Sequence, residues 1–112
     1  MSVCNIRVNI SPKEALEIVK ENVDAYLVHE ESITLEDGRS VETLIYDKYY
    51  IRAGNSVALV VIIENIEGTT GIRSVATGSS SSLFSNFDWG AASDFAEMIP
   101  AILDEYIIEV IT

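Results

Sequence analysis

A run of seven consecutive apolar residues, VALVVII at positions 57–63, stands near the middle of the chain, and five of the seven are β-branched. Turn signals flank the run, with Gly54-Asn55 before it and Glu67-Gly68 after it. The run is too short to cross a membrane, and its composition is typical of a strand that is covered on both faces. We therefore expect a central strand, with the rest of the chain arranged to cover it.

The chain before this run predicts one strand and one helix. Residues 4–10 (CNIRVNI) alternate between apolar and polar, which is the period-two pattern of a half-buried strand. Ser11 can then cap a helix, Pro12 suits the first helical position, and Glu14 completes a capping box. Apolar residues recur at helical spacing beyond it, so we expect an amphipathic helix from Pro12 to about Val28.

The middle of the chain predicts a series of strands joined by tight turns. Besides the central run, three stretches have strand-like composition, at residues 31–36, 41–51 and 70–77. The dipeptides Asp37-Gly38 and Gly54-Asn55 and the segment 65–68 are turn signals between them. Consecutive strands with short connections imply an antiparallel meander.

The last part of the chain predicts a second helix. An apolar stripe at helical spacing begins at Ala92, with acidic residues on the opposite side. Pro100 lies inside this pattern and removes the hydrogen bond to the Ala96 carbonyl, so we expect a kink there. Residues 107–111 fit either the last turn of this helix or a short terminal strand.

Together these elements predict a single α+β domain over residues 1–112. The expected order is β-α-β-β-β-β-α, in which an antiparallel sheet of four or five strands and two helices form a two-layer sandwich. Such a sandwich leaves Ala58, Val60 and Ile62 on the uncovered face of the central strand, at a cost of roughly 25 cal/mol for each Å² of apolar surface in water. A second copy of the chain, the aromatic segment 83–90, or curvature of the sheet around a cavity can cover them.

Tyrosines on the preceding strand add to this uncovered surface as candidates for an interface. Tyrosine is favoured in interfaces and ligand cavities, although cross-strand packing also accounts for it. We expect Tyr46 and Tyr50 to share one face. The predicted interface comprises Ala58, Val60, Ile62, Tyr46 and Tyr50.

Charge excludes two classes of partner. Eighteen acidic residues and seven basic ones give a net charge of −11, and the basic residues are scattered singly. A nucleic-acid binder needs a basic patch, so we expect no nucleic-acid partner and no membrane partner. The acidity suits a soluble cytoplasmic protein, or it attracts a cationic ligand or partner. The single Cys4 cannot form an internal disulfide and fits a reducing compartment.

The motifs of common catalytic and metal sites are absent from the sequence. His29 is the only histidine, and there is no phosphate-binding glycine loop, no C-x-x-C and no H-E-x-x-H. Paired carboxylates fall where the outer faces of helices are expected. We therefore predict no catalytic residue, no metal site and no cofactor, and a function that is not enzymatic.

A segment of small residues, TGSSSS at positions 77–82, is the best candidate for ligand binding. Small residues let backbone N–H groups approach a ligand, and a following helix N-terminus favours anions. The segment contains no Lys or Arg, and a connection from a strand to a helix also needs small residues for geometric reasons. The predicted ligand-binding residues are Thr77, Gly78, Ser79, Ser80, Asp88 and Trp89.

The segment from Tyr49 to Phe95 resembles a family of small bacterial proteins that is known as a domain of unknown function. The motifs that carry the resemblance are Lys48-Tyr49-Tyr50, Thr77-Gly78-Ser79 and Phe87-Asp88-Trp89-Gly90-Ala91, followed by Phe95 in the terminal helix. The loop of that family is richer in glycine than the serine run here. The resemblance therefore implies that small size matters more than the hydroxyl groups, and it implies no activity.

Three hypotheses for function remain. The first is a non-enzymatic domain that forms a homodimer, or binds a protein partner, through the uncovered face of the sheet. The second is a module for a small apolar ligand held between the sheet and the last helix, by analogy with helix-grip folds. The third is an enzyme that uses the serine-rich loop.

Overall fold

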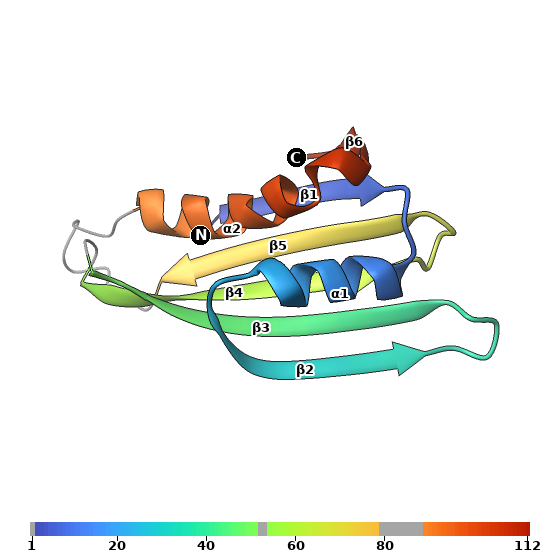
Figure 1. Ribbon diagram of the computed structural model, residues 1–112, viewed down its shortest axis with the longest axis horizontal. Coiled ribbons are helices and arrows are strands. Elements are labelled where there is room, and N and C mark those ends of the chain that lie inside the picture. The colour runs from blue at the N-terminus through green and yellow to red at the C-terminus, as the bar shows by residue number, and fades with distance from the viewer. Residues whose placement is uncertain (1, 52–53, 79–88) are drawn as a thin grey trace.

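The computed structural model describes residues 2–51, 54–78 and 89–112 of the chain. Within these residues, six strands form one antiparallel sheet and two α-helices lie on one face of it (Figure 1). The strands are β1 (Ser2–Val8), β2 (Tyr26–Thr34), β3 (Ser40–Tyr50), β4 (Asn55–Glu64), β5 (Thr70–Gly78) and β6 (Ile107–Val110). The helices are α1 (Pro12–Asn22) and α2 (Trp89–Ile102), and the 3₁₀ helix η2 follows at Asp104–Tyr106. The α+β class and the antiparallel sheet are confirmed.

Strand β4 contains the VALVVII run and lies inside the sheet, as predicted. The strand order is β2-β3-β4-β5-β1-β6, and β4 pairs with both β3 and β5. Its residues alternate between full burial and partial exposure along the whole strand. The described helices cover only one of the two faces of β4, which agrees with the predicted position of Ala58, Val60 and Ile62 on the other face.

The turns between the strands fall where the sequence predicted them. Gly38 lies between β2 and β3 with φ of 91°, and Gly68 lies between β4 and β5 with φ of 98°. Side chains of L-residues rarely adopt such positive φ values, so glycine is favoured at both positions. The β2–β3 and β4–β5 hairpins therefore close as tight antiparallel connections, and β5 ends beside β1.

Helix α1 begins with the predicted capping box. The Ser11 hydroxyl accepts a hydrogen bond from the Glu14 backbone N–H at 3.1 Å. The Glu14 carboxylate in turn accepts one from the Ser11 backbone N–H at 3.3 Å. Both bonds satisfy N–H groups that the first turn of a helix leaves without partners.

The end of α1 differs from the prediction, because the helix ends at Asn22 and not near Val28. Val23 is already extended, with φ of −79° and ψ of 119°, and the Asn22 side chain donates to the Ile18 carbonyl at 2.7 Å. Residues from Tyr26 onward form β2, which pairs with β3. Pairing with a distant strand outweighs the weak local helical pattern here.

Strand β2 forms one edge of the sheet and contains an irregularity. Its pairing with β3 shifts register between Leu27 and His29, which leaves Val28 without a paired residue. Val28 is 53% exposed. An extra residue of this kind is a β-bulge, which bends the strand and increases its local twist.

The sheet has six strands, where the sequence predicted four or five. The added strand is β6, at positions that fitted either a helical turn or a strand, and it pairs with β1 in antiparallel orientation. Backbone hydrogen bonds between Asn5 and Thr112 extend this pairing to the end of the chain. The observed order is therefore β-α-β-β-β-β-α-β.

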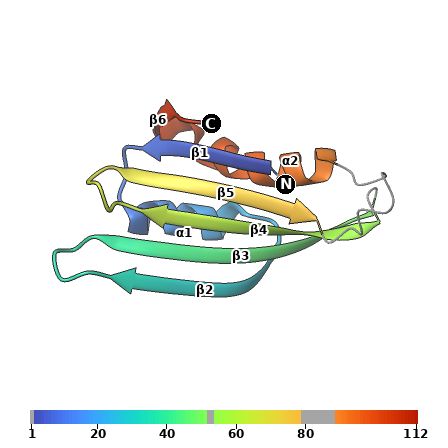
Figure 2. The same cartoon turned by 180° about the vertical axis from the view of Figure 1, so that it is seen from behind.

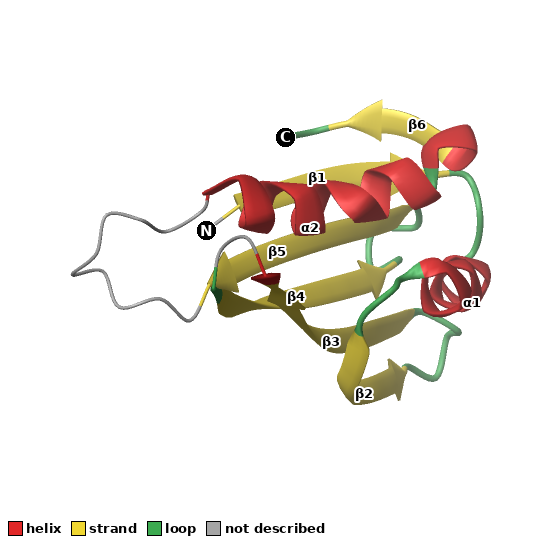
Figure 3. Ribbon diagram, turned by 60° about the vertical axis from the view of Figure 1, so that its left-hand side comes forward, coloured by secondary structure: helices red, strands yellow, loops and turns green. Residues whose placement is uncertain are grey.

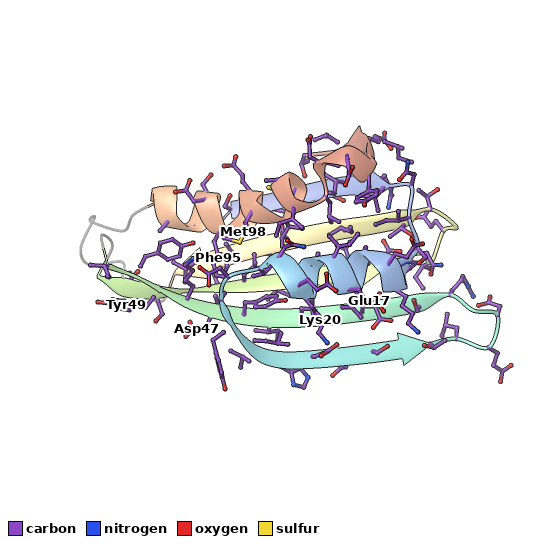
Figure 4. The ribbon with its side chains drawn as sticks, in the orientation of Figure 1. Glu17, Lys20, Asp47, Tyr49, Phe95 and Met98 are labelled. Atoms are coloured by element: carbon purple, nitrogen blue, oxygen red, sulfur yellow. The ribbon has the colours of Figure 1, made fainter. Side chains whose placement is uncertain are left out.

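The core lies between the two helices and the sheet (Figure 3). Helix α2 packs along β1 and β5, and α1 packs over β3 and β4. Figure 4 shows Phe95 and Met98 between α2 and the sheet. Phe95 is fully buried, and Met98 is partly buried against the same core.

Candidate functional site

The face of the sheet that lies opposite the helices carries apolar side chains across its centre. On β4, Ala58, Val60 and Ile62 point to this side and are partly exposed, whereas the four apolar residues that alternate with them are fully buried. Figure 2 views the molecule from this side, with both helices behind the sheet. We call this surface the open face.

Strand pairing aligns the central residues of the open face into one row. Val60 pairs with Ile45 on β3 and with Val75 on β5, and Val75 pairs with Val3 on β1. Paired residues on neighbouring strands point to the same face of a sheet, so these four side chains form a continuous apolar row. His29 pairs with Ile45 and extends the row to β2.

Other apolar side chains widen this row along the strands. Ala58 and Ile62 lie on either side of it on β4. Tyr26, Ile33 and Tyr49 share the open face by register, and they are 72%, 51% and 60% exposed. Contiguous apolar surface of this kind marks interaction sites in soluble proteins.

Charged residues lie around the apolar row on the open face. Strand β4 lies at the middle of the apolar row. Glu31 on β2 and Asp47 on β3 lie on one side of β4. Arg73 on β5 and Arg7 on β1 lie on the other side. The acidic residues lie over β2 and β3 and the two arginines over β5 and β1, but Glu64 on β4 and Glu109 on β6 also share this face beside Arg7.

Gly71 fixes the position of one of these charges. Arg7 pairs with Gly71 across β1 and β5, and a Cβ on Gly71 would collide with the Arg7 guanidinium group. The absence of that Cβ lets the Arg7 side chain cross β5 and approach Glu64 on β4, at 3.8 Å. The guanidinium group therefore lies over β5 at Gly71.

The predicted interface residues divide between the two faces of the sheet. The three β4 residues lie on the open face, but Tyr46 and Tyr50 lie on the helix side. Tyr46 is 2% exposed and belongs to the core. The Tyr50 ring meets the Phe95 ring edge to face, with centroids 5.9 Å apart, and the Lys48 ammonium lies 5.6 Å from the Tyr50 centroid. Tyr49 is the tyrosine of this strand that joins the open face.

Burial changes the acidity of Tyr46. Loss of hydration raises the pKa of its hydroxyl group, and the nearby Glu30 carboxylate raises the pKa further. The hydroxyl oxygen is buried and has no hydrogen-bond partner among the described residues. The neutral phenol is therefore the form that this position favours.

The predicted ligand-binding residues lie largely outside the described part of the chain. Thr77 is exposed near the end of β5, Gly78 ends that strand, and Trp89 begins α2. Ser79, Ser80 and Asp88 lie outside the described residues, as does most of the aromatic segment. The hypothesis of a ligand at this loop stays a prediction.

Helix α2 packs tightly where the second hypothesis requires a cavity. Phe95, Ile99 and Leu103 face the sheet, and each has no exposed surface. An apolar ligand between α2 and the sheet would need to contact these side chains. Because they have no exposed surface, there is no free apolar surface for the ligand in this part of the interface. The described structure gives the helix-grip hypothesis no support.

Two further classes of site can be addressed in the described residues. No cluster of three or more His, Cys, Asp or Glu side chains there is arranged to hold a metal ion. No helix in the described ranges is long and apolar enough to cross a membrane.

Several residues of the open face were not predicted from the sequence. Ile45, Val75 and Val3 belong to its central row, and Tyr26 and Tyr49 lie at its margins. Period-two alternation along β3 already separates Ile45 and Tyr49 from Tyr46 and Tyr50. The missing information was the register with β4, which decides which of the two sets joins Val60.

A family model described as a family of unknown function (DUF6054) matches residues 1–107 of the chain. The match confirms the resemblance to a domain of unknown function. Comparisons with curated proteins and with solved structures gave no match.

Proposed function

The chain belongs to DUF6054, a family of unknown function, and we propose that this member acts by self-association, with the open faces of two copies packed against each other. The observation that carries the proposal is the apolar row of Val3, Val75, Val60 and Ile45 across four strands. Burial of this row against a second copy removes apolar surface from water, which is the main driving force of association. No catalytic step is part of the proposal.

The size of the open face supports a dimer. Strands lie about 4.8 Å apart and rise about 3.3 Å per residue, so five strands of seven residues offer roughly 500 Å² of sheet. Two copies then bury roughly 1,000 Å² in total, which reaches the lower bound for a specific interface. Face-to-face packing of two sheets is also a standard arrangement, with strand directions about 30° apart.

The charge pattern supports one symmetry. A two-fold axis that runs along β4 places β3 of one copy opposite β5 of the other, and β2 opposite β1. The strands that carry Glu31 and Asp47 then face the strands that carry Arg7 and Arg73, of which Arg7 also contacts Glu64 of its own chain and lies beside Glu109. Opposite charges across an interface favour correct orientation, which offsets part of the repulsion between two chains of net charge −11.

We further infer that this dimer works in a reducing compartment, the bacterial cytoplasm. Cys4 is the only cysteine of the chain. Burial raises the pKa of its thiol, and a hydrogen bond with Ser74 lowers that pKa in part. The thiol form is favoured, and a thiol is a poor nucleophile for disulfide formation.

Substitution at the centre of the open face tests the dimer. We expect the native chain to sediment at twice the mass of one chain at micromolar concentration. Val60→Lys should sediment as a folded monomer, because it places two ammonium groups against each other on the proposed axis. Analytical ultracentrifugation gives the mass, and circular dichroism checks the fold.

Val110→Lys is the matched control for this experiment. Val110 is an exposed apolar residue on β6 that pairs with the buried Ile6, so it points to the helix side of the sheet. This variant should remain a dimer. A native chain that stays monomeric at high micromolar concentration would rule out the proposal, as would a Val60→Lys variant that still dimerises.

A further inference from the structure

A groove of about 480 Å³ lies on the helix side of the molecule, between α1 and the β2–β3 hairpin. Helix α1 contributes Lys13 and Leu16 to its walls. The hairpin contributes three hydroxyl groups, from Ser32, Thr34 and Ser40. A volume of this size is typical of sites for small molecules.

Glu42 lies at the base of this groove and is the unusual residue in it. It is 7% exposed, and it shares the helix side of β3 with the buried Leu44 and Tyr46. No hydrogen bond or ion pair joins its carboxylate to any residue that the structure describes. Its carboxylate oxygens are not among the fully buried unpaired atoms of the described residues, so the carboxylate opens into the groove and keeps contact with solvent.

The other carboxylate in the groove is already paired. Lys20 extends from α1 toward β2 (Figure 4), and its ammonium group donates to both carboxylate oxygens of Glu30, at 2.8 and 2.9 Å. This ion pair neutralises one end of the groove. Lys13 also lines the groove and makes no ion pair within the described residues, so the groove carries one free ammonium group beside the unpaired Glu42 carboxylate.

The surrounding groups favour an organic cation over a metal ion. A divalent metal ion needs several oxygen ligands, including more than one carboxylate, and Glu42 supplies a single free one. The hydroxyl groups can accept hydrogen bonds from the N–H groups of an ammonium or guanidinium ion. The net charge of −11 also raises the local concentration of cations around the protein.

We propose that this groove binds a small organic cation, with the Glu42 carboxylate as the anchor for an ammonium or guanidinium group and the hydroxyls of Ser32 and Ser40 beside it. Ser32 is the cross-strand partner of Glu42 on β2, so its side chain lies next to the carboxylate. The groove and the open face are on opposite sides of the sheet. Binding therefore does not depend on the proposed dimer.

The test is a titration of the isotope-labelled full chain with two simple cations, followed by amide chemical shifts. Putrescine carries ammonium groups, agmatine adds a guanidinium group, and 1,4-butanediol is a neutral molecule of the same shape as putrescine. Both cations should shift the amide signals of β2 and β3 around the groove, and butanediol should not. Glu42→Gln should weaken cation binding about tenfold or more, because it removes a charge-assisted hydrogen bond.

Two other variants make the result specific. Glu17→Gln removes the same charge from an exposed position of α1 outside the groove lining, and it should bind as the native chain does. Ser32→Lys places a tethered ammonium group beside Glu42 and should block binding of the cation. Position 32 is exposed, so it tolerates the substitution. This variant keeps the proposal testable if Glu42→Gln does not fold.

Three results would overturn the proposal. The first is that neither cation shifts the groove signals. The second is that butanediol shifts them as strongly as putrescine. The third is that Glu17→Gln weakens binding as much as Glu42→Gln, which would show attraction to the whole acidic surface and not to this groove.

Discussion

Ser74 supplies the hydrogen bond that Pro100 removes from helix α2. Pro100 has no N–H, so the Ala96 carbonyl four residues before it has no donor within the helix. The Ser74 hydroxyl on β5 donates to this carbonyl at 2.9 Å, in a buried position. The Ser74 side chain therefore satisfies the Ala96 carbonyl and links α2 to β5.

This arrangement predicts a coupled pair of substitutions. Ser74→Ala should lower the free energy of unfolding by about 1–3 kcal/mol, because it leaves the Ala96 carbonyl buried without a donor. In a Pro100→Ala background the same change should cost less, because residue 100 then supplies a helical N–H. A double-mutant cycle from urea unfolding measures the coupling. Equal costs of Ser74→Ala in the two backgrounds would contradict this account.

Tyr46 presents the opposite case, a buried hydroxyl without a partner among the described residues. Tyr46→Phe should therefore raise the free energy of unfolding by up to about 1 kcal/mol at neutral pH. Loss of more than this amount of stability in the variant would show that the hydroxyl has a partner.

The same residue predicts a loss of stability at alkaline pH. Burial, and then Glu30, raise the pKa of Tyr46 above its ordinary value of 10.0. A raised pKa in the folded state favours the protonated form, so its stability is present below pH 10 and is lost as pH rises through the folded-state pKa. Thermal unfolding across this range should separate the native chain from Tyr46→Phe, with the variant less sensitive. Parallel curves for the two proteins would argue against Tyr46 as the cause.

At the scale of elements, the capping box of α1 is the feature that the sequence predicts in full. Ser11→Ala should lower the free energy of unfolding by about 1 kcal/mol, because it removes the acceptor for the Glu14 N–H. Lys13→Ala, in the same turn but outside the cap, is the control and should change stability by less. Urea unfolding of both variants distinguishes a cap effect from a general effect in this turn.

Local chemistry made the starts and turns of elements predictable, and distant pairing decided the rest. The capping residues and the turn glycines act within four residues of chain, so the sequence carries their signal directly. The end of α1 and the identity of β6 depend instead on pairing with β3 and β1. The composition of residues 23–28 and 107–111 suits a helix or a strand. Pairing within the sheet decides which of the two structures each segment forms.

Dependence on pairing between distant strands also limited the prediction of the candidate sites. Alternation in the sequence identified Ala58, Val60 and Ile62 as a surface that lacks a cover, and the structure places them on the open face. It could not say which tyrosines join them, because that depends on register. Glu42 was overlooked among eighteen acidic residues. Its position two and four residues before Leu44 and Tyr46, on one strand face, was the signal that could have found it.

At the scale of the whole molecule, the two faces of the sheet offer separate sites. The open face is apolar at its centre, and the groove on the helix side is polar. A cation in the groove and a second copy on the open face would contact different residues, so the two proposals can fail independently. Together they describe a small dimer with one cation-binding groove on the outer side of each copy.

The bulge at Val28 bears on how far such assembly can go. An open sheet can grow without limit when strands of further copies add to its edge, which is the geometry of fibrils. At the β2 edge, the bulge breaks the ladder, and His29, Glu30 and Glu31 follow it directly. A further strand would meet a bent backbone and the Glu31 carboxylate there, so addition of a strand at the β2 edge is disfavoured. In the proposed dimer, the bulge would keep further copies from adding at the β2 edge, so contact through the open face would not extend from that edge into a fibril.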